Sequence, residues 1–260
     1  MFSIAIADFR ESLFSWRLWM LLGWLEIRQR YARSSVGPFW LTISMAVMIG
    51  SIGAVYGTLF GMNLKEYLPF LSVGLVMWTL FAQITNEGST VYINSSAYIR
   101  QAATPKILFV LQIVWRNLVI FAHNLIIIVL LLAIFGVKSW LALAFFIPAL
   151  ALYILNATWI VMIAGLLSAR FRDLPQIIGA LLQVAFYITP IMYRPHSLSR
   201  FSWIVTLNPL AYLLELVRGP LIGDIPSMMT WLVTGGMAIV GWIAALWVTG
   251  RYLKRIPYWV

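Results

Sequence analysis

Long apolar stretches without charged residues dominate the chain. They cover residues 34–64, 67–86, 139–169, 174–193 and 225–250, and residues 107–137 contain one charge, Arg116. Because an α-helix rises about 1.5 Å per residue, roughly 20 apolar residues cross the hydrocarbon core of a bilayer. The pattern therefore predicts an all-α integral membrane protein with six spanning helices. We expect these at about residues 34–62, 67–93, 107–135, 139–168, 174–193 and 226–250.

Residues 1–33 show a different pattern, with apolar residues spaced four and three positions apart. These are Phe2, Ile6, Phe9, Leu13, Trp16 and Met20. They fall on one face of a helix, which predicts an amphipathic segment lying in the membrane interface; a cap packed on a partner protein is the alternative. Asp8, Arg10 and Glu11 are inconsistent with a cleavable signal peptide, whose core is apolar. The chain thus divides into this interfacial segment and a six-helix membrane domain at residues 34–260.

A short inner helix is expected between the second and third spans, at about residues 94–104. Asn94 or Ser95 can cap its N-terminus, since both side chains accept hydrogen bonds from free backbone N–H groups. Pro105 would then start the next element. A short helix parallel to the membrane could receive force from a cytoplasmic motor; an ordinary connecting turn is the alternative.

The segment before the last span, at about residues 197–222, fits neither a span nor a hydrated loop. It includes fourteen uncharged residues, 201–214, that contain Asn208-Pro209. This run is too short to cross a membrane and too apolar to be a hydrated loop. It predicts short re-entrant or interfacial helices broken near Pro209; an outer loop folded over the bundle is the alternative.

The distribution of basic residues predicts the orientation. The chain carries 18 Lys and Arg against 8 Asp and Glu, a formal charge of +10. With the N-terminus inside, twelve of the 18 fall in inner segments, five in outer segments and one, Arg116, within a span. Cytoplasmic loops of membrane proteins are enriched in Lys and Arg. We therefore expect both termini in the cytoplasm, and we interpret the positive charge as membrane orientation rather than nucleic-acid binding.

The composition limits the kinds of catalytic and metal sites that the chain can form. Hydrophobic residues make up 62% of the chain and charged residues 10%, against about 25% charged in typical soluble domains. Cysteine is absent, which excludes disulfides and thiolate catalysis, and the two histidines lie in very different contexts, which argues against a metal centre. The sequence contains no G-x-x-x-x-G-K-[ST] loop and no convincing catalytic cluster. Uphill transport would therefore draw its energy from a partner or an ion gradient.

Three features inside the predicted spans need interpretation. Gly53, Gly57 and Gly61 form two G-x-x-x-G steps, which permit close helix packing either within the subunit or in a homodimer. Glu87 is either a functional acid or a residue at the cytoplasmic end of its span, hydrated or paired with Arg116. Arg116 itself is expected to extend its side chain towards the inner lipid headgroups, without a role in transport.

Aromatic residues are abundant, with 13 Trp, 11 Tyr and 15 Phe. Aromatic faces stack on sugar rings and permit sliding, so they suit a channel for a glycan. The candidates for such a channel are Tyr56, Phe60, Trp78, Phe81, Phe186, Tyr187 and Tyr193. Lipid contact or core packing is the alternative for each of them.

Four short motifs resemble one family of transporters. Residues 30–40, Arg-Tyr-Ala-Arg-Ser-Ser-Val-Gly-Pro-Phe-Trp, resemble the start of the first span in type-2 ABC exporter permeases that move polysaccharides. Three further motifs resemble the second half of these permeases: residues 172–175 (Arg-Asp-Leu-Pro), 189–193 (Thr-Pro-Ile-Met-Tyr) and 208–210 (Asn-Pro-Leu). The similarity covers nearly the whole chain, in order and spacing.

The resemblance implies a homodimer in the bacterial inner membrane that carries two separate ATP-binding subunits. Those subunits would use ATP and Mg²⁺, and this chain would bind no cofactor. The inner helix would couple to them through Asn94, Ser95, Tyr98 and Arg100, and the aromatic channel would lie at the dimer seam. The substrate would be a lipid-linked glycan, and the motifs do not choose among O-antigens, capsular polysaccharides and teichoic acids.

Three arginines precede the first predicted span. Arg28, Arg30 and Arg33 would lie at the cytoplasmic mouth, where guanidinium groups match the geometry of a pyrophosphate; anchoring by the positive-inside rule is the alternative. A permease of the same superfamily for a drug or a small lipid is the nearest competing function. A membrane-bound enzyme or an ion-coupled secondary transporter is a more distant one.

Overall fold

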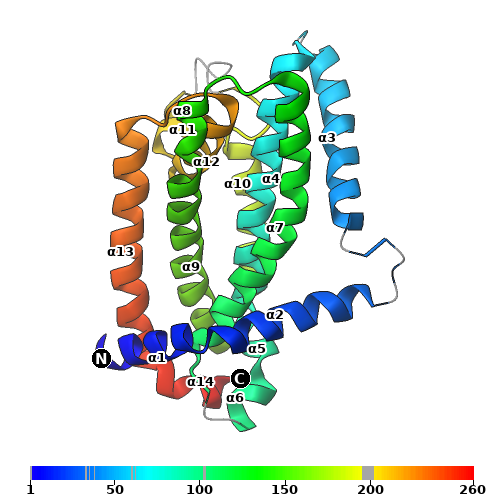
Figure 1. Cartoon of the computed structure of the whole chain (residues 1–260). Coiled ribbons are helices and arrows are strands. Elements are labelled where there is room, and N and C mark those ends of the chain that lie inside the picture. Colours follow the sequence, from blue (N-terminus) through cyan, green and yellow to red (C-terminus); the bar gives the residue numbers. More distant parts are fainter. Residues whose placement is uncertain are drawn as a thin grey trace.

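The computed structural model describes residues 2–32, 34, 36–37, 39–59, 61, 63–101, 104–194 and 202–260. Every regular element in these ranges is a helix. In the same ranges, five segments are long and apolar enough to cross a membrane, and they form a bundle (Figure 1). They are α3 (Phe39–Leu59), α4 (Leu64–Ser89), α7 (Ile107–Phe135), α8 (Trp140–Ala144) with α9 (Phe146–Arg170), and α13 (Met228–Tyr252) with the short helices η2 (Leu253–Arg255) and α14 (Ile256–Trp259). The predicted all-α membrane protein is confirmed.

The bundle has two different ends, which we call the terminal end and the far end. The terminal end, at the bottom of Figure 1, holds both chain ends and the helices α1 (Phe2–Phe14), α2 (Trp16–Tyr31), α5 (Val91–Asn94), α6 (Ser96–Gln101) and α14 (Ile256–Trp259). The far end holds α8, α11 (Ser202–Leu207) and α12 (Pro209–Ile222). The two chain ends therefore lie on the same side of the bundle. That this side is cytoplasmic stays a prediction.

The predicted span at residues 174–193 contains a shorter helix, α10 (Leu174–Ile188), of 15 residues. At 1.5 Å per residue this helix is about 22 Å long, less than the roughly 30 Å of a hydrocarbon core. The helix stops because Thr189 precedes Pro190 and adopts an extended conformation, with ψ of 136°. The count of six spanning helices therefore stays a prediction.

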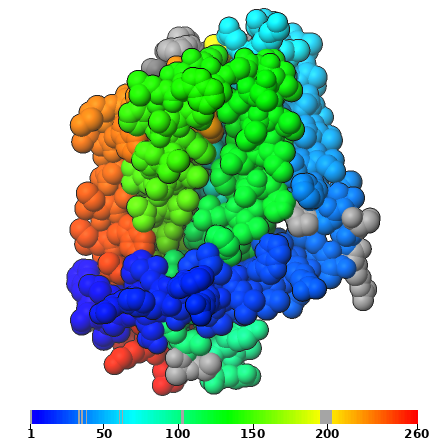
Figure 2. Space-filling model, viewed as in Figure 1, coloured from blue at the N-terminus to red at the C-terminus, as the bar shows by residue number. Residues whose placement is uncertain are grey.

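The N-terminal segment forms two helices that lie across the terminal end of the bundle. Figure 2 shows α1 and α2 as a band over the lower part of the spanning helices. α1 packs on α7 and α13, its small residues Ala5 and Ser12 are buried, and Phe9 contacts the ring of Trp242 on α13 at 5.2 Å. The larger apolar side chains of Phe2, Ile6 and Leu13 are exposed on the outer side. This arrangement suits a helix whose apolar face contacts lipid, and its place in the membrane interface stays a prediction.

Asp8 on α1 has a structural role that the sequence pattern did not indicate. Its carboxylate accepts hydrogen bonds from the backbone N–H groups of Lys106, at 3.0 Å, and Ile107, at 2.9 Å. The first N–H groups of α7 have no partner within their own helix, so Asp8 caps α7 from a distant part of the chain. Burial raises the pKa of Asp8 above its ordinary value, while the two backbone donors act in the opposite direction.

Both short helical segments expected between spans are present. α6 begins directly after Ser95, whose backbone oxygen accepts from the N–H of Ile99 at 3.0 Å. α7 begins at Ile107 rather than at Pro105. α11 and α12 are separated at Asn208, whose side chain accepts from the N–H of Leu210 at 2.9 Å. The predicted break near Pro209 is confirmed, and a re-entrant path for these helices stays a prediction.

Two of the three glycines in the first predicted span pack within the subunit. A Cβ atom on Gly53 would lie 2.5 Å from Leu68, and one on Gly57 would lie 2.6 Å from Leu64. Both leucines belong to α4, so these glycines let α3 approach α4 closely. Gly61 lies beyond the end of α3 and has a positive φ of 59°. The packing of Gly53 and Gly57 is therefore internal to the subunit.

Candidate functional site

A polar cluster inside the terminal end is centred on Arg116 of α7. The guanidinium forms ion pairs with the carboxylate of Glu26 on α2 and, at 2.6 Å, with that of Glu87 on α4. The Arg116 side chain is 11% exposed and that of Glu87 is 24% exposed. The interpretation in which Glu87 pairs with Arg116 is confirmed. The expectation that Arg116 extends to the lipid headgroups is wrong, because two carboxylates hold its guanidinium inside the protein.

Amides and a second arginine complete this cluster. Gln112 donates to Glu26 at 2.7 Å, and Asn117 donates to Glu87 at 2.8 Å. Arg30 on α2 pairs with the second oxygen of Glu87 at 3.3 Å from a half-exposed position. Charges in a medium of low polarity are tolerated only when they are paired and hydrogen-bonded. The cluster therefore joins α2, α4 and α7 next to the start of α5.

Three of the four predicted coupling residues lie beside this cluster. A cavity of about 150 Å³ is lined by Asn94, Ser95 and Tyr98 together with Gln112 and Arg116. The Tyr98 side chain is largely exposed at the surface of the terminal end. The structure thus brings the short inner helix and the polar cluster together, although their residues are separated in the sequence.

The fourth coupling residue, Arg100, contacts the C-terminal segment instead. Its guanidinium donates to the backbone oxygen of Val260. Arg172, next to the end of α9, donates to the backbone oxygen of Trp259 at 2.7 Å. The C-terminal segment therefore links α6 to the end of α9. The sequence offered no signal for this link, because every residue type has a backbone oxygen that can accept a hydrogen bond.

The three arginines predicted at the cytoplasmic mouth have different environments. Arg28 is exposed on α2, and Arg30 is paired with Glu87. Arg33 lies outside the described residues. A role of Arg28 in attracting a pyrophosphate stays a prediction.

Four of the seven predicted channel aromatics form one cluster. The ring of Trp78 lies 6.0 Å from those of Phe81 and Phe186, and Phe81 also contacts Tyr153 at 6.1 Å. Trp78 and Phe81 are buried in the core of the subunit. Tyr187 packs against Phe186 at 5.3 Å and is 65% exposed, so it is the member of this group that reaches the surface.

The other predicted aromatics lie elsewhere. Tyr56 packs on the core from α3, and Tyr193 donates its hydroxyl to the backbone oxygen of Ile188 at 2.7 Å. Phe60 lies outside the described residues. The assignment of the seven residues to a dimer channel stays a prediction.

Helix α10 presents a surface that is polar on one side and apolar on the other. None of its residues is buried. Gln176, Gln183 and Tyr187 are exposed at spacings of seven and four, which places them on one helical face. Ile177 and Leu181 belong to a neighbouring exposed apolar stripe. Tyr187 is one of the predicted channel residues, whereas the two glutamines are not, although their spacing from Tyr187 is visible in the sequence.

The long apolar helices and the internal polar clusters define a multi-pass membrane protein. The sequence model of the ABC-2 type transporter family matches residues 17–222. The chain belongs to this family, and it is accordingly a membrane permease component rather than an enzyme.

Relatives with assigned functions are similar over most of the chain. An O-antigen export system permease protein RfbA of Klebsiella pneumoniae is 24% identical over 235 residues, which cover 89% of this chain and 85% of the relative. A protein of the same name from Myxococcus xanthus is 25% identical, over 73% of this chain and 74% of the relative. The polysialic acid transport protein KpsM of Escherichia coli is 21% identical, over 74% and 76% respectively.

Proposed function

We propose that this chain is the permease subunit of an ATP-driven exporter that moves a lipid-linked polysaccharide across the bacterial inner membrane. The observation that carries the proposal is the exposed polar face of α10, formed by Gln176, Gln183 and Tyr187. A side-chain amide that faces hydrocarbon without a hydrogen-bond partner costs roughly 2–7 kcal/mol. This face therefore suits a hydrated path. Relatives named for O-antigen export and polysialic acid transport support a polysaccharide as the cargo.

The proposed path lies between two copies of the chain. A twofold axis beside α10 would bring two copies of its polar face together around one channel. Phe186 and Tyr187 would offer the passing sugar rings aromatic faces, each worth about 1 kcal/mol, in the range of other aromatic contacts. Trp78 and Phe81 would support these two side chains from inside the subunit.

Two ATP-hydrolysing subunits would bind the terminal end, which we place in the cytoplasm. They would bind ATP and Mg²⁺, and this chain would supply the docking surface. That surface would include α6, from which Tyr98 projects with 58% of its area exposed. A force on α6 would reach the spanning helices by two routes: the polar cluster around Arg116, and the contacts of Arg100 and Arg172 with the C-terminal segment.

Deleting the gene in its own host tests the function. We expect the surface glycan to disappear and its lipid-linked precursor to accumulate inside the cell, because the cargo loses its path. A wild-type copy should restore the surface glycan, measured by extraction and gel analysis. A copy with Gln176→Leu and Gln183→Leu should reach the membrane at normal levels but export at roughly a tenth of the wild-type rate or less, because the path loses its hydrating groups.

The control for these substitutions is Ser3→Leu, which replaces an exposed polar residue on α1 outside both the proposed path and the cavity beside α6. Export by this control should equal that of the wild type. The contrary result in the deletion strain is normal surface glycan together with a loss of export of a drug or a small lipid. That result would reject the polysaccharide exporter and support a permease for a drug or a small lipid.

Replacing Tyr98 with alanine tests the docking surface. Exposed tyrosines at the centre of interfaces often contribute about 2 kcal/mol, so we expect the purified ATPase subunit to bind roughly thirtyfold more weakly. The measurement is a binding titration with the permease in lipid nanodiscs. Tyr258→Ala is the control, since Tyr258 is also exposed at the terminal end but lies on α14. Equal losses in the two variants would remove the assignment of docking to α6.

A further inference from the structure

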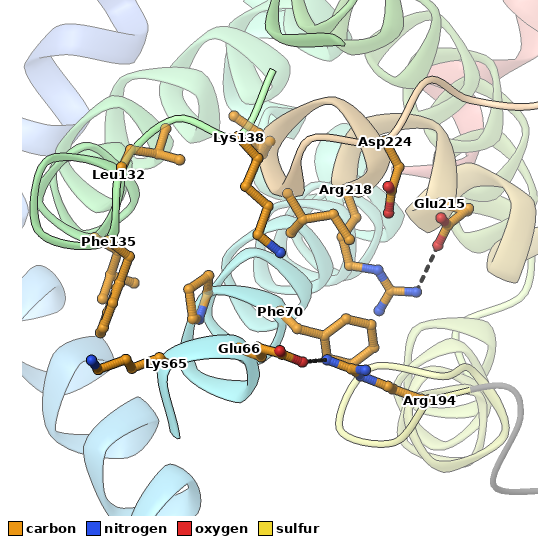
Figure 3. A pocket seen from close by; sticks show the side chains of 15 residues that line it. Lys65, Glu66, Phe70, Leu132, Phe135, Lys138, Arg194, Glu215, Arg218 and Asp224 are labelled. Carbon is orange, nitrogen blue, oxygen red and sulfur yellow. Dashed lines mark hydrogen bonds and ion pairs between the residues drawn. The ribbon is translucent and has the colours of Figure 1, made fainter. Parts of the chain in front are cut away.

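A cavity of about 450 Å³ opens at the far end of the bundle (Figure 3). It lies between the start of α4, the end of α7, the connection from α7 to α8, and α12. Its apolar wall is formed by Leu131, Leu132 and Phe135 of α7, and α12 adds Leu221 and Ile222. The rest of the lining, which we call the charged wall, carries four basic and three acidic side chains, namely Lys65, Lys138, Arg194, Arg218, Glu66, Glu215 and Asp224. The cavity therefore has the surface of a site for an amphipathic ligand.

The ion pairs of the charged wall leave positive charge unneutralised. Arg194 pairs with Glu66 at 3.2 Å, and Arg218 pairs with Glu215 at 2.8 Å. Among the residues that the structure describes, Lys138 forms no ion pair, and neither does Lys65. Figure 3 shows the Lys138 ammonium directed into the cavity, on the side where the Arg218 guanidinium also lies. Asp224 is the remaining acid, so the lining carries four basic groups against three acidic groups.

Arg218 is a buried, fixed cation beside the cavity. Its side chain is 1% exposed, its guanidinium stacks 4.1 Å from the ring of Phe70, and it donates to the backbone oxygen of Pro190 at 2.6 Å. Its Nε–H has no hydrogen-bond partner in the described structure. Because this nitrogen is buried, Arg218 acts on an anion in the cavity through its positive potential rather than through a direct hydrogen bond.

The position of the cavity is that of a lipid headgroup. α4 begins at Leu64, and its first backbone N–H groups add positive potential at this edge of the cavity. α7 ends at Phe135, and Lys138 follows three residues later in the connection to α8. Lipid phosphates lie directly outside the hydrocarbon core, at the level where apolar helices end.

We propose that this cavity binds the phosphate group of a lipid in the leaflet at the far end. Lys138 and Lys65 contact the phosphate oxygens, the buried guanidinium of Arg218 adds positive potential, and the wall formed by the end of α7 contacts the lipid chain. The site goes beyond the proposed function, because it does not depend on which cargo crosses the membrane. It takes the phosphate of a phospholipid or the pyrophosphate of a lipid carrier by the same chemistry.

Native mass spectrometry of the purified full chain in detergent tests the site with four probes. These are phosphatidylglycerol, a polyprenyl pyrophosphate, diacylglycerol and inorganic phosphate. We expect the wild-type chain to retain at least one of the two phosphate-bearing lipids and neither of the other probes. The variant Lys65→Gln/Lys138→Gln should bind that lipid at least roughly tenfold more weakly, because charge-assisted hydrogen bonds to phosphate are lost.

The controls separate binding at this cavity from general charge effects. Lys254→Gln removes an exposed lysine at the terminal end and should bind lipid as the wild type does. Lys138→Gln alone should give an intermediate loss at an unchanged unfolding temperature, since Lys138 forms no ion pair in the described structure. Stronger retention of phosphatidylglycerol identifies the bound phosphate as that of a phospholipid. Stronger retention of the polyprenyl pyrophosphate identifies it as that of a lipid carrier. Equal binding by wild type and double variant, retention of diacylglycerol, or binding of inorganic phosphate alone overturns the proposal.

Discussion

Replacing Arg116 with methionine is expected to destabilise the protein by about 2–4 kcal/mol and to loosen α2 from the bundle. Methionine fills a similar volume, so the loss reflects the missing charge rather than a cavity. Glu87, at 24% side-chain exposure, would keep only Asn117 and the half-exposed Arg30 as partners. Glu26 is 41% exposed and remains partly hydrated, so most of the loss arises at Glu87.

Two measurements check this expectation. Unfolding of the purified chain by SDS in mixed micelles gives the change in stability. Because the chain contains no cysteine, a single Ile27→Cys substitution reports the packing of α2, whose Ile27 is buried. Maleimide should label this position faster in the Arg116→Met background than in the wild-type background.

The comparison variant is Arg30→Met, which removes the outer arginine of the same cluster. Exposed ion pairs contribute about 0–1 kcal/mol, so this variant should be nearly as stable as the wild type. The double variant Glu87→Gln/Arg116→Met should recover part of the loss, because it removes the unpaired carboxylate. Equal stability of Arg116→Met and Arg30→Met would show that the cluster does not hold α2.

Replacing Gly165 with alanine is expected to force α4 and α9 apart at the terminal end. The new Cβ would lie 2.9 Å from the backbone oxygen of Gly88 and 2.5 Å from a methyl group of Val91. A backbone oxygen in a helix cannot rotate away, so the helices must separate. Such overpacking costs about 1–3 kcal/mol. Gly88 lies three residues before α5, so the shift should also displace the proposed coupling helix α6.

Gly236→Ala on α13 is the matched control for this substitution. A Cβ on Gly236 would meet no atom within 4 Å. Alanine favours a helix over glycine by about 1 kcal/mol, so the control should be as stable as the wild type or more stable. The two variants should therefore change the SDS unfolding midpoint in opposite directions, and Gly165→Ala should also lower ATPase stimulation by the permease. A stabilised Gly165→Ala variant would show that α4 and α9 do not meet as closely as described.

The element boundaries that the sequence predicted best have strong local signals. The third span was expected at residues 107–135, the range of α7, which ends before Gly136 with its positive φ of 82°. The break between α11 and α12 follows from Asn208-Pro209 in the same way. The stretch 174–193 is longer than the helix α10, which ends at Ile188. Counting apolar residues does not include the local effect of Pro190, which keeps Thr189 out of the helical conformation.

The candidate site was predicted less completely than the helices. The pairing of Glu87 with Arg116 was one of the open interpretations, whereas the second partner, Glu26, came only from the packing of α2 on α7. The aromatic list mixed surface and core residues, because abundance does not reveal which way a side chain faces. Gln176 and Gln183 were overlooked since a lone glutamine does not interrupt an apolar stretch.

The sequence by itself determined that this chain is helical and lies in a membrane. In lipid every backbone N–H and C=O needs a partner within its own segment, so the length of an apolar stretch largely decides its structure. Only the tertiary structure decided which polar groups meet. The partners of Arg116 lie 29 and 90 residues away, and Asp8 caps a helix that begins 99 residues further on. Such pairings depend on how each helix is rotated about its axis and packed on its neighbours, which the apolar length of a segment does not encode.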